Sequence, residues 1–218
     1  MTTFPNSPRL VKAGLVLVDP QSAQVLKVIT LQYNPDQLSR TLAVQSTAGE
    51  GDRSDALRLK GPPVETIKLE AFIDATDHLE LPQNHPETVR SGIQPQLAVL
   101  ETIVYPSTMA LQQNASQARF GLIEIAPMQA PLTLFVWSRH RIVPVRITEF
   151  SITEEAFDPA LNPIRAKVSI GLRVLTVTDL GFDHKGGGVF MSYLRAKEQL
   201  VAKAPHAEMN SLGIQGLP

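Results

Sequence analysis

The 218-residue chain has five histidines and no cysteine, so metal or nucleophilic chemistry would have to come from histidines, carboxylates and hydroxyls. The absence of cysteine excludes disulfides, cysteine-ligated zinc and thiol catalysis. Two histidines, His78 and His85, share a loop with carboxylates that could hold a metal ion, namely Asp74, Asp77, Glu80 and Glu87. No two histidines have the i, i+4 spacing of a helical zinc site. We therefore favour a solvated loop over a metal site.

Three further segments have residue types that could bind a ligand. Residues 49–55 resemble a calcium loop but lack its Asx positions and its final bidentate glutamate. The glycines at 186–188 could cradle a phosphate, but no Lys and Ser/Thr accompany them, which favours a hinge. Trp137 with His140 and Arg141 could stack on a sugar or a base, although an aromatic residue at a strand end more often belongs to a core or an interface. The sequence predicts no catalytic residue, no cofactor and no bound metal.

The composition is that of a globular protein with nearly balanced charge. Hydrophobic residues make up 43% and charged residues 19%, with 20 Lys and Arg against 21 Asp and Glu. A dedicated nucleic-acid binder normally has a basic excess, and near-zero net charge is typical of a protein whose surfaces are committed to partners. No signal peptide and no apolar run of about 20 residues is visible. We expect a soluble protein made in the cytoplasm, with no nucleic acid and no membrane anchor.

Elements alternate between strands and a few helices in an order typical of mainly-β proteins. We expect a β-barrel or sandwich of two packed antiparallel sheets with one flanking helix and a C-terminal helix extension. Residues 74–92 are expected to form a loop. The expected strands are 10–18 and 24–33, which form a hairpin, and 64–73, 132–137, 142–154 and 164–174; the expected helices are 94–104 and 189–202.

The strand at 164–174 has the clearest alternation of apolar and polar residues in the chain. Ile164, Ala166, Val168, Ile170, Leu172 and Val174 point one way, so Arg165, Lys167 and Arg173 point the other. Charges in such a pattern cannot all be buried without partners. We predict that these three cations line a wet or partner-facing surface, and that Arg173→Glu leaves folding intact.

The polar, glycine-containing segment at 46–63 is expected to be a long functional loop. It contains four residues that we assign to an interface: Arg53, Asp55, Arg58 and Lys60. We predict that this loop orders only in an assembly, where it reaches an adjacent ring or subunit.

The C-terminal segment is expected to be a separate module. We divide the chain into a β-barrel domain at 1–182 and a linker, helix and tail at 183–218. The helix at 189–202 is amphipathic, with Phe190, Tyr193 and Leu194 along one stripe. The glycines before it would give a flexible joint, so we predict an anchor on an outer partner and not a part of the barrel core.

Three stretches together resemble the tube-protein domain of phage-tail-like contractile injection systems, and in particular the adaptor between tube and baseplate. The first, 31–38, has the aromatic-Asn-Pro signature at Tyr33. The second, 67–74, is similar to a family strand that ends in an acidic residue. The third runs from 134–137 through Phe157 to 162–166, with Ser138 in place of a family glycine. The LysM module that many relatives of this adaptor have is absent from the sequence.

This resemblance implies a hexameric ring of β-barrel protomers. It also implies the partners: the inner tube protein, the spike or hub protein and the baseplate wedge proteins. We expect a structural adaptor or tube initiator that assembles in the cytoplasm and is incorporated into the injection particle. An inner tube protein of the same machine and a small-ligand-binding β-barrel module are the alternatives.

Overall fold

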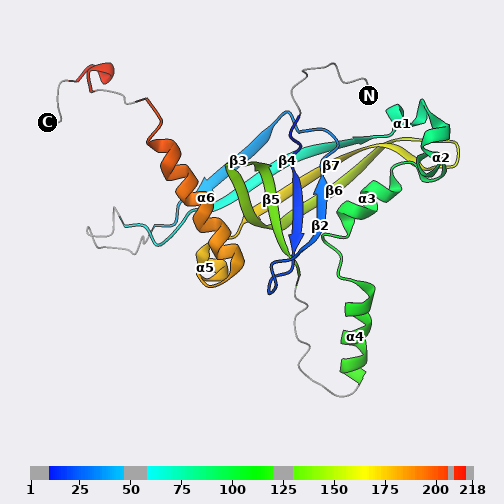
Figure 1. Ribbon diagram of the computed structural model, residues 1–218, viewed down its shortest axis with the longest axis horizontal. Coiled ribbons are helices and arrows are strands. Elements are labelled where there is room, and N and C mark those ends of the chain that lie inside the picture. The colour runs from blue at the N-terminus through cyan, green and yellow to red at the C-terminus, as the bar shows by residue number, and fades with distance from the viewer. Residues whose placement is uncertain (1–9, 47–57, 120–129, 206–208, 215–218) are drawn as a thin grey trace.

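A computed structural model describes residues 10–46, 58–119, 130–205 and 209–214 (Figure 1). Seven strands form one sheet in the order β2-β1-β5-β6-β7-β4-β3, and every neighbouring pair is antiparallel. The strands are β1 (Gly14–Val18), β2 (Val25–Thr30), β3 (Leu38–Ala43), β4 (Val64–Asp74), β5 (Leu132–Ser138), β6 (Arg141–Phe157) and β7 (Pro163–Val174). The expected mainly-β fold is confirmed, and β3 is a strand that the sequence pattern missed.

The strands belong to one sheet and not to two, because β6 joins both halves. Its first part, Arg141–Val145, pairs with β5, whereas residues 145–157 pair with β7. The sheet coils and brings the β2-β1-β5 half over the β3-β4-β7 half, but it does not close, since its end strands β2 and β3 are not paired with each other. The expectation of two separate sheets is corrected in this respect.

The core lies inside the coiled sheet and is closed at both ends by helices. Leu15 of β1, Phe135 of β5 and Ile170 of β7 are among its buried side chains. One end is covered by α3 (Gln94–Glu101) through Leu97, and the other by α6 (Lys185–Val201) through Phe190. Burying a side chain of this size contributes about 1.5–3 kcal/mol.

Residues 74–92 form short helices and not the expected loop: α1 (Thr76–Leu79), η2 (Pro82–Asn84) and α2 (Pro86–Ser91). A proline in the first turn of both η2 and α2 is compatible with a helix start, because its missing N–H has no partner there. Gly92 ends α2 with a φ of 56°. The predicted helix after it is confirmed as α3.

The remaining helices are α4 (Thr108–Arg119), α5 (Val177–Leu180) and η3 (Met209–Leu212). The sequence pattern predicted none of the three. In the part of the chain that the structure describes, no helix is both long and apolar enough to cross a membrane.

The glycines before the C-terminal helix are not a hinge but the first turn of α6. The His184 Nδ1 atom accepts a hydrogen bond from Gly186 N at 3.0 Å and caps the helix. A Cβ atom at Gly187 would lie 2.0 Å from the Gly181 carbonyl oxygen, so only glycine allows this close approach. Phe190 and Tyr193 are 6% and 5% exposed and belong to the core. The expectation that this helix lies outside the core is therefore wrong, although the domain division at 182 stays a prediction.

We predict that Phe190→Ala lowers the free energy of unfolding by about 3–5 kcal/mol, because it leaves a cavity between α6 and the sheet. Leu200→Ala, at a position of the same helix that is 45% exposed, should change it by less than about 0.5 kcal/mol. Urea denaturation measures both. A chain truncated after Phe182 that unfolds with an unchanged midpoint would contradict the core role of α6.

Candidate interface on the polar face of the sheet

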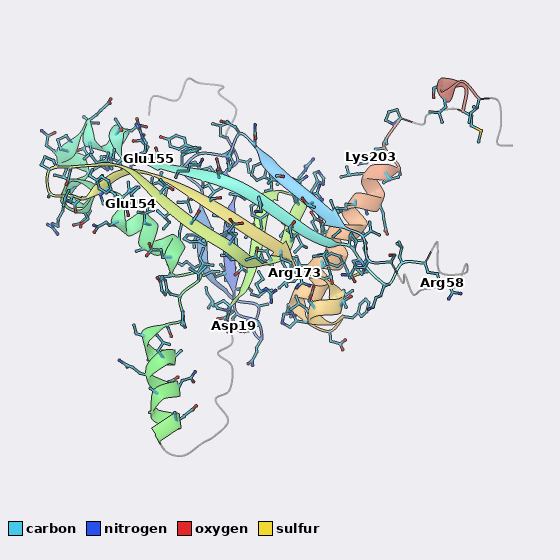
Figure 2. All side chains as sticks on the ribbon, turned by 180° about the vertical axis from the view of Figure 1, so that it is seen from behind. Asp19, Arg58, Glu154, Glu155, Arg173 and Lys203 are labelled. Carbon is cyan, nitrogen blue, oxygen red and sulfur yellow. The ribbon has the colours of Figure 1, made fainter. Side chains whose placement is uncertain are left out.

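The outer face of the long strands is polar because side chains alternate along β4, β6 and β7. In the pairing register, Lys68 and Gly171 lie side by side, as do Glu70 and Ser169. Figure 2 shows these strands from behind, with Glu154 and Glu155 near one end and Arg173 near the other. The residues of this polar face are Ser39, Thr41, Thr66, Lys68, Glu70, Phe72, Asp74, Arg146, Glu149, Ser151, Thr153, Arg165, Lys167, Ser169, Gly171 and Arg173.

Four cations of the polar face, all except Arg146, form ion pairs with carboxylates. The three that the sequence singled out bind neighbours: Arg165 Nε lies 2.8 Å from an Asp74 oxygen, Lys167 Nζ 2.8 Å from Glu70 and Arg173 Nη2 2.7 Å from Asp179. A fourth pair joins Lys68 to Glu149 at 2.9 Å. Exposed pairs contribute only about 0.2–1 kcal/mol each. Their main effect is a hydrated surface without a strong excess of either charge.

Gly171 makes room for the Lys68–Glu149 ion pair. Both residues are register partners of Gly171, one on β4 and one on β6, so their side chains meet across β7. A Cβ atom at Gly171 would lie 2.8 Å from the Glu149 Cβ atom. A glycine inside a strand often marks such a close approach.

We predict that Gly171→Val destabilises the protein by about 1–3 kcal/mol, because the added side chain displaces Glu149 and overpacks the face. Ser169→Val, two residues away on the same face, is the control and should be close to neutral, since valine suits a strand. Chemical denaturation compares the two variants. Equal midpoints would show that the ion pair does not need the glycine.

Asp74 is the last residue of β4 and lies beyond Leu69, the last β4 residue that pairs with β3. The side-chain amide of Gln32 replaces the missing strand: it donates to the Asp74 carbonyl at 2.8 Å and accepts from the Asp74 N–H at 3.0 Å. The Asp74 carboxylate accepts hydrogen bonds from Thr76 and from Arg165. Burial alone would raise the pKa of Asp74, but the hydrogen bonds from Thr76 and the Arg165 charge hold it below its ordinary value of 3.8.

A carboxyl group with a lowered pKa stabilises the fold above its ordinary pKa, and this stabilisation is lost as the pH falls through the lower, folded-state value. We predict that Asp74→Asn lowers the free energy of unfolding at neutral pH. The difference from the unmodified protein should shrink as the pH falls below 3.8. Denaturation at several pH values tests this, with the exposed Asp36→Asn as control. A difference that persists in acid would mean that the charge of Asp74 is not responsible.

A buried carboxylate, Glu65, ties α6 to the sheet. Its side chain is 5% exposed and lies 2.6 Å from Arg40 Nη2 on β3 and 3.5 Å from Lys197 Nζ on α6. Tyr193 donates to it at 3.3 Å and accepts from Arg40 at 3.1 Å. The ammonium of Lys197 lies 4.1 Å from the centre of the Tyr193 ring. Sequence patterns do not predict this cluster, because its members lie far apart in the chain.

The predicted interface residues have different positions in the structure. Arg53 and Asp55 lie outside the described residues, as does most of the loop at 46–63. Arg58 and Lys60 are exposed, and the Lys60 N–H donates to the Gln45 carbonyl at 2.9 Å. The predicted interface residues of the C-terminal helix are corrected in part. Phe190 and Tyr193 are buried within this chain, and Leu194 is half-buried.

The candidate ligand sites do not form one site. His78 and His85 stack with ring centroids 4.2 Å apart. Within the described ranges, no group of three or more His, Asp or Glu residues could hold a metal ion. Trp137 packs against the core, tilted on Phe135, as we favoured. The calcium-like stretch at 49–55 lies outside the described residues.

The sequence profile described as contractile injection system tube protein matches residues 10–177. The chain belongs to this family. The match covers all seven strands and stops at the first residue of α5, so the tube-protein family accounts for the sheet but not for α6. The family that the motifs resembled is confirmed, and the chain contains a contractile injection system tube-protein domain.

Two solved structures are similar to this tube-family protein. One is the tail of an empty gene transfer agent particle with C6 symmetry, at 11% identity and a TM-score of 0.30 over 75% of this chain and 90% of that one. The other is the virion of a native gene transfer agent particle, at 10% identity and a TM-score of 0.28; the match covers 74% of this chain and 90% of that one. Likenesses this weak carry no argument here. No curated protein matches the sequence.

Proposed function

We propose that this tube-family protein forms a hexameric ring that serves as an adaptor or tube initiator, joining the inner tube to the spike hub and the baseplate. The observation that carries the proposal is a pair of open strand edges on the long half of the sheet. On the side away from β7, residues 146–157 of β6 pair with no described strand. On the side away from β4, β3 is also unpaired among the described strands.

These two edges are suited to join one protomer to the next. In the order β6-β7-β4-β3 each strand is antiparallel to its neighbour, so β3 and β6 run in opposite directions. If rotation about an axis roughly along the strands relates the copies, β3 of one meets β6 of the next as a further antiparallel pair. Such a head-to-tail contact closes into a ring and leaves neither of these two edges exposed.

In such a ring, the polar face forms one side of a continuous wall. Its paired charges favour a hydrated surface, as the inside of a conduit requires, and disfavour a dry contact. We propose that Arg165, Lys167 and Arg173 line that surface. We also propose that the protein assembles in the cytoplasm and is then incorporated into the injection particle.

The adaptor role is favoured over the inner-tube role by the part of the chain beyond the family match. Helix α6 adds an ordered element after residue 177, and its end presents Leu200 and Val201, which are 45% and 72% exposed. We propose that this end, with Leu194, contacts baseplate proteins. The small-ligand alternative has little support, because the apolar cavity beside Leu15 and Phe135 measures about 10 Å³, whereas ligand pockets need about 300 Å³ or more.

The ring predicts covalent multimers from engineered cysteines, since the natural chain has none to interfere. Ser39 on β3 and Ser151 on β6 are exposed and lie on the polar face. Oxidised particles with Ser39→Cys and Ser151→Cys in one chain should give a ladder that ends at the hexamer. Neighbouring pairs, such as Thr41 with Thr153, allow for a shift in register.

The single-cysteine variants are the controls and should give no species larger than a dimer. Absence of the ladder from every pair would contradict the ring. The adaptor role is decided by copy number: an adaptor remains at one ring per particle, whereas the copy number of an inner tube protein grows with tube length.

A further inference from the structure

Helix α4 packs against no other helix or strand in the part of the chain that the structure describes. Figure 1 shows it apart from the sheet and from the other helices. The Ser107 hydroxyl accepts from the Ala110 N–H at 3.1 Å, so the start of the helix is satisfied locally. Met109 and Leu111 remain 67% and 49% exposed. A helix of 12 residues is marginal in water without tertiary packing. A stable α4 therefore needs a surface that the described part of its own chain does not provide.

The surface of α4 indicates what kind of partner it fits. From residue 108 to 118 the helix has no charged side chain. Leu111, Ala115 and Ala118 follow the i, i+4, i+7 spacing and form one stripe, while Gln113 lies on the opposite side. A stripe of one leucine and two alanines allows close approach to a flat, uncharged surface.

The short half of the sheet presents a surface of this kind. Alternation along β1, β2, β5 and the start of β6 places six apolar side chains on its outer face. Val25 and Val28 are both 61% exposed, and Ile142 is 38% exposed. Its apolar set is Val16, Val25, Val28, Leu134, Val136 and Ile142, and Arg141, which pairs with Ser138, lies at the end of this strand pair.

This face continues a surface that is already covered by helices. Leu132 lies two residues before Leu134 on the same face of β5 and is buried. Helix α6 covers it: a Cβ atom at Gly186 would lie 3.1 Å from the Leu132 Cδ1 atom. The outer face is thus helix-covered at the α6 end and bare beyond it. An exposed apolar surface on this scale is typical of an interaction site.

We propose that α4 of one copy packs on the bare outer face of β2-β1-β5 in a second copy. The inference rests on the proposed ring, which brings identical chains together. Because residues 108–118 of the helix have no charged side chain and the bare strands present valines, leucine and isoleucine, the two surfaces can meet without burying an unpaired charge. The contact joins two different surfaces and can therefore repeat around a ring.

Engineered cysteines test the contact in the full chain. Particles with Ala115→Cys on α4 and Val28→Cys on β2 should form covalent multimers on oxidation. Moving the first cysteine to the opposite side of the helix, as Gln113→Cys with Val28→Cys, should cause loss of the ladder. Hydrogen exchange of residues 108–118 should be fast in the monomer and slow in the particle.

Three outcomes would overturn the proposal. A disulfide within one chain would mean that α4 folds back on its own sheet, and a disulfide to another protein would mean that the partner is not a second copy. Fast exchange of α4 in the particle would mean that nothing covers it. The Ser39–Ser151 ladder is measured in parallel, so a ring that forms without the α4 contact is distinguished from the absence of a ring.

Discussion

The pairing of β6 with two different neighbours is the constraint on which the rest of the structure depends. Up to Val145, β6 pairs with β5 along one edge, and from Val145 onward it pairs with β7 along the other edge. This change of partner joins the two halves of the sheet into one. Pro144 lies at this point, where its missing N–H is tolerated because the β6–β7 ladder is only beginning there. Beyond it, β6 is left with a free edge, and the proposed ring uses this edge.

The coiled sheet needs covers at both ends, and the chain provides them from distant segments. At one end, α2 and α3 are held against the β6–β7 turn, because the Ile93 N–H donates to the Pro163 carbonyl at 2.8 Å. The same carbonyl lies so close to Gly92 that there is no space for a side chain at that position. At the other end, α6 is held by Phe190 and by the buried Glu65. Removing either partner of such a buried ion pair costs more than the pair contributes.

The three faces of the sheet have different chemistry, and this difference relates the fold to assembly. The inner face is apolar and filled by the core. The outer face of the long strands has paired charges and suits water, while the outer face of the short strands is apolar and is covered only at the α6 end. A protein that worked as a monomer would have little use for such a division, whereas a ring component has a wet side and a partner side.

The sequence by itself determined the strands with strict alternation, the α3 helix and the family, because these depend on local periodicity and on short motifs. It also placed Arg165, Lys167 and Arg173 on one face. Only the tertiary structure decided that glycine in the first turn of α6 allows the helix to pack closely on the backbone of Gly181, because folding brings Gly187 and Gly181 together. It likewise decided that Leu161 has a positive φ in the β6–β7 turn, where the side-chain amide of Asn162 donates a hydrogen bond to Asp158. Burial of Glu65 has no local signal, for its partners at 40, 193 and 197 meet it only in the folded chain.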